Sequence, residues 1–171
     1  VALALTFNRS VVYLVLDDNN IIASGVQQFT DMLNHNDTLI ELSLISNDIQ
    51  DEGCSYIAKG LNSNVGLTRL WLKANQIGDD GVKHLSEGLK DNRSLQSLDL
   101  SSNNIGAKGC EHLANCLKVN QGLLHLYLEN NKVDSNGAEY IANALKVNNH
   151  LQELQLNRNS VADAGSRMLA S

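Results

Sequence analysis

Leucine and other aliphatic residues recur along this chain in a pattern that repeats every 28 residues. The pattern is L-x-x-L-x-L-x-x-N-x-(I/V)-x-x-x-G, and its six copies start at Val11, Leu39, Leu67, Leu95, Leu123 and Leu151. A fixed period of this length is typical of a solenoid, in which each unit buries its apolar side only against its neighbours. We therefore expect residues 1–171 to form a single array of about six units.

Within each unit, the spacing of apolar residues changes from that of a strand to that of a helix. In the unit that starts at Leu95, apolar Leu98 and Leu100 alternate with polar Ser97 and Asp99, which predicts a short half-buried strand over 95–100. From residue 105 to 117 the apolar residues are spaced three or four apart, which predicts an amphipathic helix. Stacked units then give an α/β solenoid that curves, with parallel strands inside and helices outside.

Asparagine occupies two fixed places in the pattern. One lies at the turn after each strand, at Asn19, Asn47, Asn75, Asn103, Asn131 and Asn159. Because an asparagine amide offers two donors and an acceptor, we expect this set to hydrogen-bond the neighbouring loop backbones. The other lies just after each predicted helix, and we expect it to adopt the left-handed conformation that ends helices; it comprises Asn36, Asn64, Asn92, Asn120 and Asn148.

Both ends of the chain fall inside a unit. The segment 1–8 has the same character as 141–148, the second half of a repeat, and the chain stops at Ser171 within the matching segment. We therefore expect an array that is truncated in the middle of a repeat at each end. Core-type side chains exposed there favour fraying or end-to-end self-association.

The segment 95–106, LQSLDLSSNNIG, resembles the ribonuclease-inhibitor-like class of leucine-rich repeats, and looks most like the uniform units of NOD-like receptor sensor arrays. That class also includes ribonuclease inhibitor and the Ran GTPase-activating protein. The resemblance extends over the whole chain. It implies a right-handed, horseshoe-like solenoid with strands on the concave side and helices on the convex side, and a concave face that binds proteins.

Composition narrows the class of partner. The net charge is −6 with acidic and basic residues scattered, which disfavours nucleic acid. No apolar stretch approaches the ~20 residues that a membrane-spanning helix needs. The three cysteines lack C-x-x-C spacing, so we expect them in the core and the protein in a reducing, cytoplasmic setting.

Candidate sites for chemistry are weak. No nucleophile motif, phosphate loop or carboxylate pair stands out, so we expect neither an enzyme nor a cofactor. Asp17-Asp18 with Asn19-Asn20 is a candidate cation site, but a polar loop edge is the simpler interpretation. His84 and His112 share one helix position and are a candidate metal pair, but a packing role explains them better, so we expect no metal.

The strand residues that vary between units lie on the predicted concave face. The only tryptophan, Trp71, lies there between Arg69 and Lys73, and Tyr127 follows two units along the same row, roughly 10 Å away by strand spacing. Tryptophan, tyrosine and arginine dominate interface hot spots. We therefore predict a partner-binding site at Trp71, Arg69, Lys73 and Tyr127, ringed by Glu41, Asp99 and Glu129. In the alternative, Trp71 lies flat under Arg69 and binds nothing.

These observations predict a protein-interaction module that presents a curved sheet to a macromolecular partner. The resemblance adds two narrower alternatives. One is a GTPase-activating regulator of the Ran GTPase-activating protein type, and the other is a ligand-sensing segment of a NOD-like innate immune receptor. These alternatives differ from a plain interaction module in what the bound partner does after it has docked.

Overall fold

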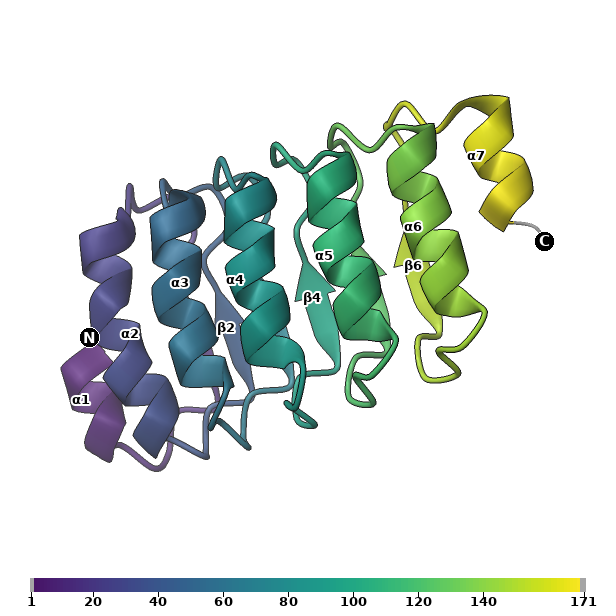
Figure 1. The fold of residues 1–171 in the computed structure, drawn as a ribbon. Coiled ribbons are helices and arrows are strands. Elements are labelled where there is room, and N and C mark those ends of the chain that lie inside the picture. Colours follow the sequence, from purple (N-terminus) through teal and green to yellow (C-terminus); the bar gives the residue numbers. More distant parts are fainter. Residues whose placement is uncertain (1, 170–171) are drawn as a thin grey trace.

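Strands and helices alternate from one end of the chain to the other in a computed structural model, which describes residues 2–169 (Figure 1). The helices are α1 (Ala2–Phe7), α2 (Ala23–His35), α3 (Gln50–Leu61), α4 (Asp79–Leu89), α5 (Ala107–Leu117), α6 (Ser135–Leu145) and α7 (Ala162–Leu169). The strands are β1 (Tyr13–Val15), β2 (Glu41–Ser43), β3 (Arg69–Trp71), β4 (Ser97–Asp99), β5 (His125–Tyr127) and β6 (Glu153–Gln155). Each strand is the central part of a predicted apolar segment.

The six strands form one parallel sheet in sequence order, and each strand pairs with the next at a register shift of one 28-residue unit. Leu70 therefore lies between Leu42 and Leu98, and these three side chains are fully buried. Residues on either side of each central leucine point to the opposite face of the sheet. The repeat period thus places equivalent positions of all units in straight rows.

The helices form a second layer, and Figure 1 shows α2 to α7 side by side along one side of the sheet. Adjacent packed helices need about 8–10 Å, whereas parallel strands lie about 4.8 Å apart. The stack must therefore curve with its strands on the inner side. This confirms the predicted right-handed α/β solenoid with a concave sheet and a convex helical layer.

The glycine that ends the pattern is required by close packing. A methyl group on Gly81 would lie 2.5 Å from Oδ1 of Asp51, 2.8 Å from Cγ2 of Ile77 and 3.0 Å from Cα of Asp51. Asp51 itself accepts a hydrogen bond from the backbone N–H of Gly78 at 2.6 Å. An acidic residue at the start of one helix therefore binds the residue that immediately precedes the next helix, in addition to its favourable position at the positive end of its own helix dipole.

The asparagines that follow the strands form the predicted ladder. Oδ1 of Asn103 accepts hydrogen bonds from the backbone N–H groups of Asn75 and Ile77, both at 3.0 Å. Its Nδ2 donates to the carbonyl oxygens of Leu72 at 3.0 Å and Leu100 at 2.9 Å. The amide thus joins two consecutive units. Similar contacts recur at Asn47, Asn75, Asn131 and Asn159.

The asparagines after the helices do not adopt the left-handed conformation, so that prediction was wrong. Asn36 has φ −98°, and none of the other four has a positive φ. They form a second ladder instead. Nδ2 of Asn92 donates to the carbonyl oxygen of Leu61, the last residue of α3 in the unit before, at 2.8 Å. Oδ1 of Asn92 accepts a hydrogen bond from the backbone N–H of Leu95 at 2.8 Å. Each asparagine thus satisfies a helix-end carbonyl that the helix itself leaves unpaired.

A positive φ recurs at a different position in every unit, namely at the residue immediately before the asparagine of the strand-end ladder. Its φ lies between 54° and 57° in all six units, at Asp18, Ser46, Ala74, Ser102, Asn130 and Arg158. The chain leaves the strand here and enters the asparagine turn. Because the residue type varies among units, residue type does not indicate this strained position.

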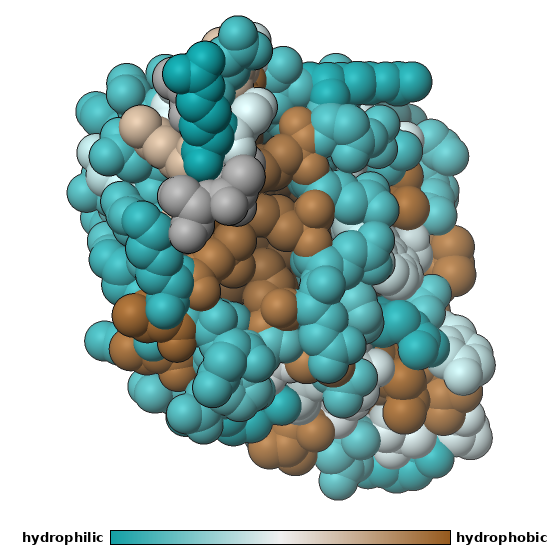
Figure 2. All heavy atoms as spheres, turned by 90° about the vertical axis from the view of Figure 1, so that its right-hand side faces the viewer, coloured by the Kyte–Doolittle hydropathy of each residue, from teal (hydrophilic) through white to brown (hydrophobic). Residues whose placement is uncertain are grey.

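The end of the stack at α7 exposes part of the apolar core. Figure 2 views this end directly and shows hydrophobic residues gathered in its middle. Leu154 and Leu156 are half-buried, whereas Leu126 and Leu128 at the same positions one unit earlier are fully buried. End-to-end self-association stays a prediction. Within residues 2–169, every helix is too short or too polar to pass through a lipid bilayer.

Candidate protein-binding surface

The concave face carries the variable strand residues in the predicted rows. Arg69 and Trp71 flank the buried Leu70 on β3 and are both half-exposed. Trp71 is in register with Ser43 on β2 and with Asp99 on β4, and Asp99 is in register with Tyr127 on β5. One row of the sheet thus places an acidic side chain between the two aromatic residues.

Trp71 and Tyr127 lean toward each other over Asp99. Their ring centroids are 6.3 Å apart with an interplanar angle of 34°. Two strand spacings would separate their backbones by about 9.6 Å, so the rings close most of the gap above β4. Aromatic pairs prefer tilted or offset arrangements at this separation. The structure therefore brings the two predicted aromatic residues into one contact.

The hydroxyl of Tyr127 lies among carboxylates. It donates a hydrogen bond to Oε2 of Glu153 at 3.1 Å. Burial, the hydrogen bond to Glu153 and the negative charges of Glu153 and Asp99 raise the pKa of Tyr127. Asp99 in turn accepts from the backbone N–H of Ser101 at 2.7 Å. The tyrosine is thus held neutral and fixed in orientation.

Arg69 belongs to a separate cluster on the other side of Trp71. Its Nε donates to Oε2 of Glu41 at 2.6 Å, and its guanidinium carbon lies 5.7 Å from the centroid of the Tyr13 ring. The hydrogen bond to Glu41 raises the pKa of Arg69. Arg69 therefore stacks on Tyr13, whereas Trp71 contacts Tyr127. Whether Trp71 binds a partner stays a prediction.

The remaining predicted residues lie apart. Glu129 forms an ion pair with Arg158, with Oε1 3.7 Å from Nε. Lys73 is exposed, and the described residues offer it no ion pair within 4.0 Å. The predicted set is thus divided into an aromatic centre at Trp71, Asp99 and Tyr127 and three peripheral elements.

Sequence reasoning missed several residues of this face. Glu153 and Tyr13 each complete one cluster, and they occupy the same row as Arg69, three units and two units away respectively. Ser97, His125 and Glu153 also lie in register, and Oγ of Ser97 is 3.0 Å from Nδ1 of His125. Glu153 instead contacts Tyr127 and Gln155. A relay of the Ser-His-acid kind needs the acid on the imidazole, so this row does not assemble one.

The weaker candidates for chemistry have structural roles. Oδ1 of Asp17 accepts from the N–H of Ile45 at 2.9 Å, which makes it part of the loop edge. Cys54, Cys110 and Cys116 are buried as predicted, and burial raises the pKa of the Cys110 and Cys116 thiols to about 12. Residues 2–169 contain no group of three or more histidine, cysteine or acidic side chains placed to hold a metal.

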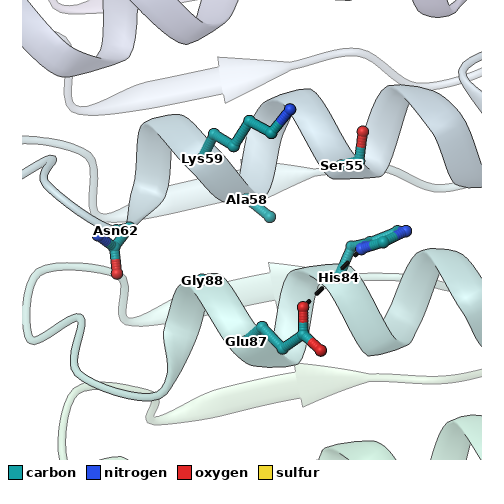
Figure 3. A pocket seen from close by; sticks show the side chains of 7 residues that line it. All are labelled: Ser55, Ala58, Lys59, Asn62, His84, Glu87 and Gly88. Atoms are coloured by element: carbon teal, nitrogen blue, oxygen red, sulfur yellow. Dashed lines mark ion pairs between the residues drawn. The ribbon is translucent and has the colours of Figure 1, made fainter.

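A groove lies on the convex side between α3 and α4, with a volume of about 530 Å³. Figure 3 shows Ala58 between the two helices, Lys59 extending away from α4, and the ion pair of His84 with Glu87, whose atoms are 3.9 Å apart. The helices touch at Gly88, where a methyl group would lie 2.8 Å from Cα of Ala58. The groove therefore follows from close packing through two small residues.

Comparison with known proteins identifies the repeat. The "Leucine Rich repeat" family matches five segments that together exceed half of the chain, at residues 35–58, 63–86, 91–114, 119–142 and 147–170. No curated protein sequence matches the chain.

Two solved structures are similar in fold. One, described as leiomodin-1 actin-binding site 2, has a TM-score of 0.63 and 18% identity over 99% of this chain and 82% of its own. The other, the tropomodulin C-terminal domain of Caenorhabditis elegans, has a TM-score of 0.69 and 15% identity over 85% of this chain and 89% of its own. The repeat pattern, the fold and the family match agree, and the chain belongs to the leucine-rich repeat family.

Proposed function

We propose that the chain is a protein-interaction module whose partner binds on the concave face through Trp71 and Tyr127. The observation that carries this proposal is the contact of the two rings over Asp99 on an open sheet. Each of the two side chains is partly buried by its neighbours, and their mutual contact orders the pair before any partner arrives. A preordered aromatic pair loses little conformational entropy on binding.

The surroundings of the pair fit an interface centre. Aromatic residues at the middle of an interface, with polar residues at its rim, form the usual arrangement of binding hot spots. Here Lys73, Glu129 and the Arg69–Glu41 pair surround the rings on the same face. The convex side lacks a comparable aromatic contact among residues 2–169.

A capture experiment tests this proposal. The parent chain, Trp71→Ala and Tyr140→Ala are immobilised and exposed to the same extract, and the proteins retained are identified. Tyr140 is an exposed aromatic residue on helix α6 and so controls for the loss of an aromatic side chain. We expect a partner that the parent and Tyr140→Ala retain and Trp71→Ala does not. Retention of the same proteins by all three would contradict the proposal.

The identity of the retained partner also separates the narrower functions. A GTPase whose hydrolysis the chain stimulates would support a GTPase-activating regulator. A microbial or endogenous ligand that binds the isolated array would support a sensing segment of the NOD-like kind.

Actin is a second candidate partner because one similar structure is described as an actin-binding site and matches 99% of this chain. Direct co-sedimentation with filamentous actin tests it. If actin binds on the concave face, the parent sediments with filaments and Trp71→Ala does not. If the parent stays in the supernatant at every actin concentration, actin is excluded as a filament partner.

A further inference from the structure

The concave face contains two clusters of aromatic and acidic residues, and only one of them includes a cation. In the first cluster, Arg69 lies over the ring of Tyr13 and donates to Glu41 at 2.6 Å. The guanidinium thus stacks on an aromatic face and pairs with a carboxylate at the same time. Arginine suits such a position because it is planar and carries five donors in a fixed arrangement.

The second cluster has the same components without the arginine. Trp71 and Tyr127 supply the aromatic faces, and Asp99 and Glu153 supply two half-buried carboxylates. Among residues 2–169, neither carboxylate has a basic group within 4.0 Å. The two negative charges instead act on the hydroxyl of Tyr127, whose pKa they raise after burial and hydrogen bonding.

The polar contacts of Asp99 leave room for a cation, whereas both oxygens of Glu153 accept hydrogen bonds, one from Tyr127 and one from Gln155. The backbone N–H of Ser101 donates a hydrogen bond to Oδ1 of Asp99. No hydrogen bond to Oδ2 of Asp99 is present among the described residues. A carboxylate next to aromatic rings is partly removed from water, which strengthens its attraction for a positive charge. A cationic side chain placed here gains both an ion pair and a stacking contact.

Basic residues of this chain set the direction of approach. Arg69 lies on β3 and Lys73 lies two residues beyond its end, on either side of Trp71, and both repel a further cation from this unit. The acidic residues Asp99, Glu129 and Glu153 lie on β4 to β6 or at their ends. The favourable position for a cation is therefore above Asp99 and toward Tyr127.

We propose that the protein partner inserts an arginine side chain beside the Trp71–Tyr127 pair, where its guanidinium stacks on the rings and pairs with Asp99. This inference rests on the proposed function and specifies the chemistry of the partner. The chain supplies its own precedent in Arg69, which fills the equivalent place between Tyr13 and Glu41.

Binding of short peptides tests the inference directly. The probe is an acetylated and amidated Gly-Arg-Gly-Arg-Gly peptide, and the matched neutral probe has citrulline at both arginine positions. Because Trp71 is the only tryptophan, its fluorescence reports contact at this site alone. We expect the arginine peptide to change the fluorescence with a Kd at least tenfold lower than that of the citrulline peptide, and the difference to shrink as salt is added.

Two variants of equal net charge locate the effect. Asp99→Asn removes the negative charge but keeps an oxygen that accepts from Ser101, and Glu111→Gln removes an exposed charge on helix α5. We expect Asp99→Asn to weaken binding of the arginine peptide tenfold or more and Glu111→Gln to change it less than twofold. Equal binding of the arginine and citrulline peptides, or equal effects of the two variants, overturns the inference.

Failure of the arginine inference can be distinguished from failure of the proposed function. If the arginine peptide fails to bind but Trp71→Ala still loses a captured partner, the concave face is the binding site and its partner presents a different group. If Trp71→Ala retains every partner, the proposed function itself fails.

Discussion

The rings of Trp71 and Tyr127 meet at a centroid distance of 6.3 Å although β4 separates their strands. The residue between them is Asp99, which is short enough to let both rings lean inward. A bulky side chain at position 99 would hold the rings apart. The contact therefore depends on three consecutive units and is a property of this array, whereas the leucines and asparagines serve the repeat in general.

The hydroxyl of Tyr127 should lose its proton at a higher pH than an ordinary tyrosine does. Burial first, and then the hydrogen bond and charge of Glu153, raise the pKa of Tyr127 above its ordinary value of about 10. Because the folded pKa is higher than the unfolded one, the resulting stability is present below about pH 10 and is lost as the pH rises through the folded value. An ultraviolet titration of the phenolates should show one late tyrosine.

Two variants check the assignment of that tyrosine. Tyr127→Phe should remove the late component, and Glu153→Gln should move it to lower pH. A titration in which the late component survives in Tyr127→Phe would contradict the assignment.

The asparagines of the ladder should contribute unequally to the stability of the fold. Asn103 is buried and joins two units, so Asn103→Ala leaves backbone groups unpaired and should lower the free energy of unfolding by about 1–3 kcal/mol. Asn19 is exposed and its side-chain amide donates only to the carbonyl of Asp17. Asn19→Ala should therefore change the free energy of unfolding by less than about 0.5 kcal/mol. Urea denaturation of both variants measures the difference, and equal losses would show that the ladder contacts do not matter.

The contact between α3 and α4 should not tolerate a larger residue at Gly88. A methyl group there would clash with the carbonyl oxygen of Ala58, so Gly88→Ala should cost about 1–3 kcal/mol. Gly106 provides a matched control, because a methyl group at that position has its nearest contact at 3.5 Å, with Oδ2 of Asp79. Gly106→Ala should leave the thermal midpoint nearly unchanged. A stable Gly88→Ala protein would mean that the helices separate more easily than their packing indicates.

The period of 28 residues predicts most of the fold from the sequence alone. Strict alternation around Leu98 predicted β4, and the apolar spacing from residue 105 to 117 predicted α5, because these patterns report burial directly. The ladder at Asn103 was also predictable, since a side-chain amide provides two donors and an acceptor at a turn. Each of these predictions rests on six copies of the pattern and not on a single segment.

The failures have physical causes. Asn92 follows a helix, and asparagine at that place serves either a left-handed turn or a side-chain bond to the neighbouring unit; the sequence does not distinguish the two. The position that is left-handed in every unit is that of Ala74 and its equivalents, and the varied residue types there do not indicate a positive φ. The lean of Trp71 toward Tyr127 and the pairing of Arg69 with Tyr13 depend on rotamers, which strand spacing does not specify.

The affinity of the captured partner for Trp71→Ala, compared with Tyr140→Ala, tests the account most directly. Calorimetric titration of the purified partner into each variant gives the two dissociation constants. Loss of a hot-spot tryptophan is expected to cost about 2 kcal/mol or more, which corresponds to an affinity roughly 30-fold weaker. Tyr140→Ala should stay within twofold of the parent chain. Equal affinities of the two variants would show that the partner binds elsewhere than on the concave face.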